Sequence, residues 1–239
     1  MDGQRWRERA GSFGAAADVY ERSRPAYPVE AVRWALPATA RRVLDLGAGT
    51  GKLTEVLLDL GLDVVAVEPS EAMRARIAGR AEVLAGAAER LPLADASVDA
   101  VLVGQAFHWF DAERALAETA RVVRPGGTLG LLWNVLDDSA QWVKRLGGLI
   151  AAEDLVSHLD GVAPFTGRSD WCDPEHDEFD YSQSLDADLL VDLVASRSAL
   201  ITLPEQERLD VLAQVRRLAP EQEPFELPYV TDVWRSVRA

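Results

Sequence analysis

The hydrophobic positions between residues 42 and 133 fall into short runs that alternate with helical stretches. The first run contains Val43, Leu44 and Leu46 and stops at Gly47, as expected of a strand buried on both faces. Similar runs predict strands at 63–67, 98–103 and 128–133, with a weaker strand at 82–85. Helices are expected at 50–60, 70–79 and 111–123. This alternation favours a parallel sheet with helices on both faces.

The remaining segments are less regular. Residues 1–40 read as helical turns that end in a stretch punctuated by Pro25, Pro28 and Pro37. Residues 134–175 lack a strand period and predict helices and loops. A sixth strand is expected at 176–185, helices at 186–199 and 204–218, and a final strand at 225–237. The chain has no internal repeat and no low-complexity linker, which favours a single domain over residues 1–239.

Composition narrows the possible partners. The net charge of −14 argues against a nucleic acid, whose recognition needs a positive surface. The sequence has no apolar run long enough to span a bilayer, so we expect no membrane partner. Its N-terminus is charged and lacks a signal-peptide core. The single cysteine, Cys172, cannot form an internal disulfide. These features predict a cytoplasmic protein, and they predict no particular oligomeric state.

A glycine loop follows the first expected strand. Residues 43–51 read VLDLGAGTG, so Gly47, Gly49 and Gly51 are spaced G-x-G-x-G. Glycines allow tight turns and close backbone approach to a ligand, and the start of the following helix offers free N–H groups. The spacing differs from the G-x-G-x-x-G of dinucleotide-binding proteins, and no G-K-[ST] ending for a triphosphate follows.

Glu68 ends the second expected strand, 23 positions after Asp45. A carboxylate at this place can accept hydrogen bonds from the two hydroxyls of a ribose. The alternative is a solvated acid that caps the next helix. The preceding glycine loop favours the ribose role.

Three more segments complete the pattern: residues 86–93, 101–110 and 121–129. With these motifs in order, the chain resembles the class I S-adenosylmethionine-dependent methyltransferases. The likeness is greatest to the methyltransferase type 11 group, which contains ubiquinone-pathway and trans-aconitate methyltransferases. The resemblance is strong over residues 40–134 and extends to an opening segment at 13–28.

The resemblance implies a Rossmann-like α/β fold with a mostly parallel sheet. Seven strands are expected, the last of them antiparallel, with helices on both faces and a helical insert after the fifth strand. The implied organisation is an N-terminal lid at 1–40, a cofactor-binding core at 41–134, an insert over the active site at 135–175, and C-terminal strands and helices at 176–239.

The resemblance also implies S-adenosylmethionine as the cofactor, with S-adenosylhomocysteine as its product. The glycine loop would hold the methionine end, Glu68 the ribose, and Gln105 would lie near the sulfonium. At Ala87 many relatives carry Asp, so contact with the adenine would rest on backbone and packing. Met73 would lie along the adenine or simply pack in the core. The implied cofactor-binding residues are Tyr20, Arg24, Asp45, Gly47, Ala48, Gly49, Gly51, Glu68, Pro69, Met73, Ala87, Ala88, Glu89 and Gln105.

The acceptor side has fewer signals. His108 could act as a base, since the free imidazole titrates near neutrality, or could form part of the pocket wall. The expected substrate-pocket residues are His108, Trp109, Trp133 and Asn134, although the tryptophans could equally be core. His158 and His176 read as structural residues.

Other chemistries lack their residues. Cys172 lies far from the place of a cytosine-methylating nucleophile, and residues 104–107 differ from the motif of nucleic-acid amino methylation. Asp137 and Asp138 have no aligned partner for a magnesium ion, so we expect no metal. The sequence therefore predicts methyl transfer to a small molecule, with O-methylation as first choice. The alternatives are a non-catalytic S-adenosylmethionine-binding sensor or scaffold and, less favoured, a nicotinamide dehydrogenase.

Overall fold

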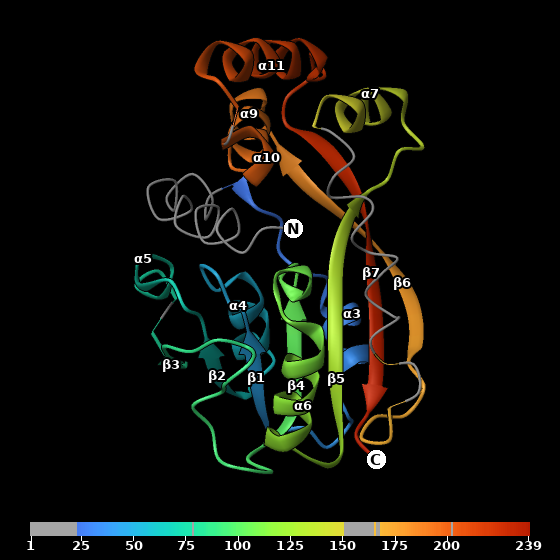
Figure 1. Ribbon diagram of the computed structural model, residues 1–239. Helices are drawn as coiled ribbons and strands as arrows, with labels where there is room; N and C mark the ends of the chain where they lie inside the picture. The colour runs from blue at the N-terminus through green and yellow to red at the C-terminus, as the bar shows by residue number, and fades with distance from the viewer. Residues whose placement is uncertain (1–22, 78, 151–164, 166–167, 202) are drawn as a thin grey trace. The chain divides into compact units, whose positions relative to one another are not determined.

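The computed structural model describes residues 23–77, 79–150, 165, 168–201 and 203–239. Within them, seven strands form one sheet in the order β3-β2-β1-β4-β5-β7-β6 (Figure 1). Six strands are parallel and one is antiparallel, as predicted. The strands are β1 Arg42–Leu46, β2 Asp63–Val67, β3 Glu82–Leu84, β4 Val98–Gly104, β5 Val123–Leu136, β6 Glu175–Leu185 and β7 Phe225–Val237. The switch in strand order lies between β1 and β4, where ligands bind in sheets of this kind.

The helices follow the expected alternation. They are α3 Val29–Ala35, α4 Lys52–Asp59, α5 Glu71–Arg74, α6 Ala112–Val122, α7 Gln141–Leu149, α9 Ala187–Ala195, α10 Ser198–Ile201 and α11 Glu205–Leu218, with a 3-10 turn, η2, at Phe107–Trp109. Two N-terminal caps fit the sequence: Ser70 accepts from the Met73 N–H and Asp111 from the Arg114 N–H. No helix among the described residues is both long and apolar enough to cross a membrane.

Three elements differ from the sequence-based expectation. The helix expected at 186–199 is divided into α9 and α10. The helix expected at 70–79 is only the single turn α5, because Arg76 and Ile77 bond to carbonyls three residues back and the Ile77 side chain is buried beside Ala48 and Ala66. β5 is longer than expected at both ends. Its pairing with β4 is interrupted by a register shift, so that Val98 faces Val123 but Ala100 faces Thr128. Residues 125–127 lie inside this bulge.

The described residues divide into two compact units. The larger unit contains residues 26–77, 79–134, 165, 168–179 and 231–239, and therefore β1–β4, most of β5, the start of β6 and the end of β7. The smaller unit contains residues 23–25, 135–150, 180–201 and 203–230, with α7, α9, α10 and α11.

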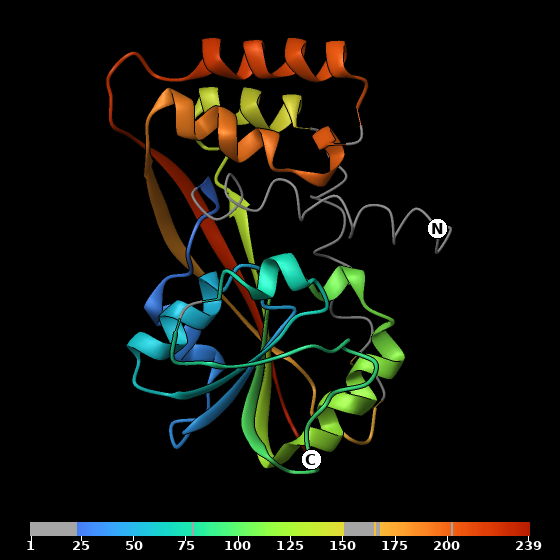
Figure 2. The same cartoon turned by 90° about the vertical axis from the view of Figure 1, so that its left-hand side faces the viewer.

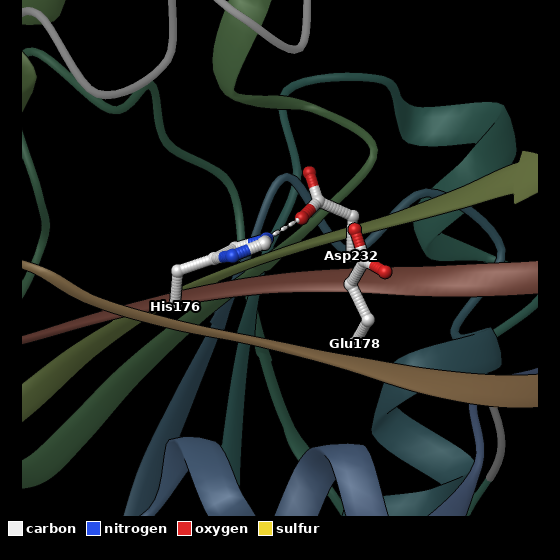
Figure 3. Close-up of side chains that lie close together, drawn as sticks. All are labelled: His176, Glu178 and Asp232. Carbon is white, nitrogen blue, oxygen red and sulfur yellow. Dashed lines mark hydrogen bonds and ion pairs between the residues drawn. The ribbon is translucent and has the colours of Figure 1, made fainter.

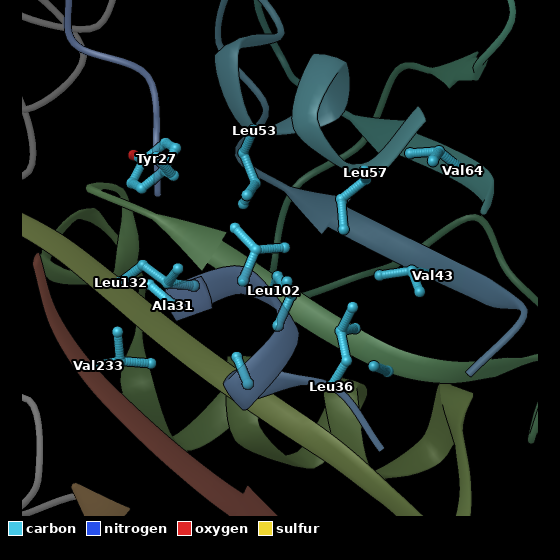
Figure 4. Packing of buried hydrophobic residues seen from close by; sticks show 13 residues of the cluster. Tyr27, Ala31, Leu36, Val43, Leu53, Leu57, Val64, Leu102, Leu132 and Val233 are labelled. Carbon is cyan, nitrogen blue, oxygen red and sulfur yellow. The ribbon is translucent and has the colours of Figure 1, made fainter. Parts of the chain in front are cut away.

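The core of the larger unit lies between the sheet and helices α3 and α4 (Figure 4). Ala31 of α3 and Leu57 of α4 share it with Val43 of β1 and Leu102 of β4. Gly130 on β5 lets α3 come close, because a side chain there would meet Leu102 and Ala35 at 2.5 and 2.8 Å. Helix α6 lies on the opposite face of the sheet (Figure 2). Such burial on both faces explains the continuous apolar runs of the inner strands.

The smaller unit has a separate hydrophobic core. Helices α7, α9 and α11 contribute Leu146, Leu193 and Val215, which are all buried, and β7 contributes Leu227 and Tyr229. The residues from the expected insert that the structure describes in this unit, 135–150, thus pack with the C-terminal helices. Residues 180–185, the end of β6, belong to the same unit.

Candidate functional site

The glycine loop, residues 47–51, connects the end of β1 to α4. Its first two residues, Gly47 and Ala48, both donate backbone hydrogen bonds to the Val67 carbonyl at the end of β2. Gly47 has a φ of +72°, and a Cβ there would lie 2.7 Å from the Cβ of Ala106. The loop therefore packs directly against the segment that follows β4, and only glycine fits at this contact.

Gly49 differs from Gly47 in its surroundings. Its φ is +57°, but a Cβ there would meet nothing within 4 Å. The backbone of Gly49 consequently borders open space, and a ligand can approach it closely. The hydroxyl of Thr50 is buried and has no hydrogen-bond partner among the described residues. A buried unsatisfied hydroxyl is uncommon and indicates a missing polar partner.

Glu68 is tied to this loop by its carboxylate. Oε2 accepts the Gly49 N–H at 3.0 Å, and Oε1 accepts the Ser70 N–H at 2.8 Å. The side chain is 6% exposed, and this burial raises the pKa of the Glu68 carboxyl, although the two backbone bonds oppose the shift. The sequence predicted Glu68 at the strand end, and the structure brings its carboxylate to the glycine loop.

Asp45 lies on β1 beneath the same loop. Its carboxyl is 1% exposed, and the Thr54 hydroxyl of α4 donates to Oδ2 at 2.5 Å. Burial raises the pKa of Asp45 to about 7, with the hydrogen bond from Thr54 opposing the shift and the charge of Glu68 adding to it. Asp45 thus anchors the first turns of α4. The sequence pointed to Asp45 but not to Thr54, which carries no motif of its own.

Pro69 and Met73 follow Glu68. Met73 is buried at 7% exposure on α5, and Arg74 donates to the carbonyls of Glu68 and Pro69 at 2.7 and 2.6 Å. The guanidinium therefore fixes the backbone directly after the Glu68 carboxylate. No sequence motif pointed to Arg74.

The third motif forms a small turn. Arg90 donates a backbone hydrogen bond to the Ala87 carbonyl, Ala87 is exposed and Ala88 is buried. The Glu89 carboxylate accepts the Asp111 N–H at 2.9 Å. Glu89 thus joins this turn to the start of α6, a role that the sequence did not predict.

Gln105 directly follows β4 with a φ of +57°, which is strained for a side chain of this size. Its backbone N–H donates to the Leu132 carbonyl at 2.9 Å, and its side-chain Nε2 donates to the Asn134 carbonyl at 3.0 Å. Both acceptors lie on β5. Tyr27 packs against Gly104, where a Cβ would lie 2.4 Å from the Tyr27 hydroxyl. Such strain, held by neighbouring strands, is common where a backbone is shaped for function.

The four predicted substrate-pocket residues have different surroundings. His108 is exposed and its ring lies 4.6 Å from that of the half-buried Trp109. Trp133 is 1% exposed and belongs to the core. Asn134 is fully engaged, because Nδ2 donates to the Ala26 carbonyl at 2.8 Å and Oδ1 accepts from Thr231 at 2.7 Å. His108 and Trp109 thus remain the accessible members of this set.

Two cofactor-binding residues, Tyr20 and Arg24, were expected from the N-terminal segment. Tyr20 and His158 lie outside the described residues. Arg24 belongs to the smaller unit, where its guanidinium donates to the side-chain and backbone oxygens of Ser196, both at 3.1 Å. Its predicted contact with the cofactor stays a prediction.

Comparison with known proteins gives a consistent result. A methyltransferase domain family matches residues 44–131. The chain is 46% identical to an uncharacterized methyltransferase of Mycobacterium tuberculosis, with 98% of each covered. It is 33% identical to an uncharacterized methyltransferase-like protein of Schizosaccharomyces pombe, with 84% of this chain and 82% of that protein covered. A solved structure from Anaeromyxobacter dehalogenans, provisionally described as a type II methyltransferase, superimposes with a TM-score of 0.67 at 26% identity, covering 90% of this chain and 97% of the other.

Proposed function

This chain belongs to the class I S-adenosylmethionine-dependent methyltransferase family, and we propose that it binds S-adenosylmethionine at the glycine loop and Glu68 and methylates an oxygen atom of a small molecule. Methyltransferase activity follows from the family. The cofactor contacts, the oxygen atom and the class of acceptor are the proposed part.

The observation that carries the proposal is the position of Glu68. Its two carboxylate oxygens each accept one backbone N–H, from Gly49 and from Ser70. A carboxylate has about four lone-pair sites, so each oxygen keeps room for one more donor. The vicinal hydroxyls of a ribose supply two donors with matching spacing. The two backbone bonds hold the carboxylate in place before any ligand arrives, which lowers the entropic cost of binding.

Two further features of the loop fit the same cofactor. The space above Gly49 admits a ligand at the backbone, and the buried hydroxyl of Thr50 needs a polar partner. The methionine end of S-adenosylmethionine carries an amino group and a carboxylate, either of which would satisfy a hydroxyl. Both features belong to the loop that follows Asp45 and that is hydrogen-bonded to the end of β2 and to Glu68.

Methyl transfer depends more on the alignment of the reacting atoms than on an acid or a base. When bound, the cofactor supplies an electrophilic methyl carbon on its sulfonium. The protein then has to hold the acceptor atom in line with that carbon and keep water out. Gln105, fixed by two hydrogen bonds to β5 next to the glycine loop, is placed to shape the wall at this point.

Two classes of oxygen acceptor differ in their need for a base. A carboxylate is already deprotonated at neutral pH and needs no base. A hydroxyl acceptor gains from a base, and His108, exposed in η2, is the residue that supplies one. The two acceptor classes therefore differ in whether His108→Ala lowers the rate of methyl transfer.

The deciding experiment measures binding and turnover on the same preparations. We expect calorimetry to give micromolar binding of S-adenosylmethionine to the full chain and little binding of a reduced nicotinamide dinucleotide. Glu68→Ala is expected to abolish the former. Glu71→Gln is the matched control, since this exposed acid lies three residues further on in α5. Transfer of labelled methyl groups to fractionated acidic and phenolic metabolites then identifies the acceptor.

Each outcome has a clear meaning. Preference for the dinucleotide, or equal losses in Glu68→Ala and Glu71→Gln, would overturn the cofactor site. Tight binding without transfer to any small-molecule pool would point to a sensor or scaffold. Label in a product that survives treatments cleaving methyl esters and ethers would overturn the oxygen acceptor alone.

A further inference from the structure

Three potential metal ligands lie together on the last two strands of the larger unit. His176 and Glu178 come from β6 and Asp232 from β7 (Figure 3). One ligand atom from each residue can be chosen so that all three lie within 4.8 Å of one another. His176 and Glu178 are two positions apart on a strand, so their side chains share one face of the sheet.

Trp234 orients two of these side chains. Its ring lies 4.2 Å from the His176 ring, tilted by 30°. Its Nε1–H donates to Asp232 Oδ2 at 3.3 Å, while Asp232 Oδ1 contacts His176 Nε2 directly. Metal ligands are commonly positioned by outer hydrogen bonds of this kind. Asp232 Oδ1 therefore faces His176, while Trp234 holds Asp232 Oδ2.

The negative charges of Glu178 and Asp232 are incompletely balanced by their neighbours. Glu175, at the start of β6, is paired with Arg235. In the part of the chain that the structure describes, neither Glu178 nor Asp232 meets an arginine or lysine. Two carboxylates close together with one imidazole favour a further positive charge between them. A divalent cation would balance both carboxylates.

We propose that His176 Nε2 and the carboxylates of Glu178 and Asp232 bind a divalent transition-metal ion of the zinc or cobalt class. The ion takes the place of the direct hydrogen bond between His176 Nε2 and Asp232 Oδ1, and any proton held there passes to water. An imidazole nitrogen with two carboxylates suits these ions, whereas calcium and magnesium prefer oxygen ligands alone. Water completes the coordination, since His176 and Glu178 are exposed and Asp232 is partly exposed. This site has no local sequence signature, because His176 and Asp232 are 56 positions apart in the chain.

The site is structural and separate from the proposed cofactor site. β6 runs parallel to β1 (Figure 1). His176 and Glu178 lie at the start of β6, where Asp232 of β7 meets them, and the glycine loop lies at the end of β1. The two places are therefore at opposite ends of their strands. A bound ion would tie β6 to β7, and the proposal does not depend on the proposed function.

The test uses the untagged full chain, stripped with a chelator and titrated with Co²⁺ and Zn²⁺. We expect one ion per chain, a visible Co²⁺ absorption band typical of nitrogen and oxygen ligands, and a higher melting temperature with metal. Glu178→Gln is the decisive variant, because among the described residues its exposed side chain has no hydrogen bond or ion pair whose loss could disturb folding. It should weaken binding by at least about tenfold. His176→Ala and Asp232→Asn should do the same.

Asp177→Asn is the matched control: it removes the same charge from the neighbouring position of β6, on the other face. It should leave metal binding and melting temperature unchanged. Equal weakening in this control would show diffuse attraction to surface acids and overturn the site. So would Ca²⁺ binding as tight as Co²⁺ binding, or unchanged Co²⁺ affinity in Glu178→Gln. Methyl transfer should be the same in all these variants at saturating cofactor.

Discussion

The backbone N–H of Gly49 donates a 3.0 Å hydrogen bond to the carboxylate of Glu68. This one contact joins the loop after β1 to the end of β2, so the two motifs that are separate in the sequence form a single rigid surface. A change at either residue should therefore affect both the shape of the loop and the binding of a ligand on it.

Gly49→Ala should separate backbone strain from ligand binding. Both Gly49 and Gly61 have positive φ with open space at the Cβ position, so alanine at either should cost about 1–2 kcal/mol of unfolding free energy. Gly49→Ala alone should also weaken S-adenosylmethionine, by about tenfold or more. Urea unfolding and calorimetry on the two variants check this. Equal affinity in both would show that ligands do not approach Gly49.

Gly47→Ala should be more harmful to folding than Gly49→Ala. The added Cβ would lie 2.7 Å from Ala106, so the strain of a positive φ is joined by overpacking. The expected cost is about 2–5 kcal/mol in total. The unfolding free energies of the two variants, compared in one urea series, give the difference. A loss no larger than that of Gly49→Ala would show that the segment after β4 moves away freely.

Stability should fall as pH rises toward neutrality, because of Asp45. The pKa of this carboxyl is raised to about 7 in the folded state, against about 3.9 in an unfolded chain. The folded protein then binds a proton that the unfolded chain releases, so stability declines between about pH 4 and 7. The slope from this group is at most about 1.4 kcal/mol per pH unit.

Asp45→Asn should flatten that decline, since asparagine stays neutral throughout. Asp59→Asn, on the exposed end of α4, should leave it unchanged. Urea unfolding at several values between about pH 4.5 and 8 gives the slopes, with the decline ending near pH 7. If the wild-type slope persists in Asp45→Asn, another group is responsible.

Gln105→Gly should be more stable than Gln105→Ala. Neither variant keeps the amide that bonds to Asn134, so the comparison isolates the φ of +57°. Glycine adopts this conformation at no cost, and the advantage over alanine should be about 1 kcal/mol. Both variants should transfer methyl groups more slowly than the wild type. Thermal melts and initial rates test the two statements, and equal melting temperatures would argue against strain at this residue.

Asn134 and Thr231 should be energetically coupled. Thr231→Val leaves Asn134 Oδ1 without the donor that lies 2.7 Å away, in surroundings that are almost dry. The expected cost is about 1–3 kcal/mol. In a double-mutant cycle with Asn134→Ala, the coupling should be about 0.5–3 kcal/mol. Additive losses would mean that the Ala26 bond alone holds this side chain.

The sequence predicted an element well where a single local feature, such as burial of a strand, determines it. The strand at 63–67 matches β2 and the strand at 225–237 matches β7, because apolar runs and alternation record burial directly. Asp111, which opens the helix expected at 111–123, caps α6. The helix at 70–79 was predicted too long, since burial of Ile77 overrode helix propensity.

The candidate site likewise contains residues that the sequence could predict and residues that it could not. Asp45, Gly49 and Glu68 stand in motifs, so their approach could be predicted. The roles of Thr54 and Asn134 depend on partners from other elements. His176 and Asp232 meet only because β6 and β7 are neighbours, and no local pattern records this.

The strand order also constrains how the chain can fold during its synthesis. β5 lies beside β4 on one side and beside β7 on the other, yet β7 is the last strand to leave the ribosome. At about 5–20 residues per second, the outer edge of β5 waits roughly 5–20 s for its neighbour. An unpaired inner strand is a template for pairing with another chain. The nascent protein therefore passes through a period of exposure that the finished sheet no longer displays, and shielding by chaperones would be most valuable in that interval.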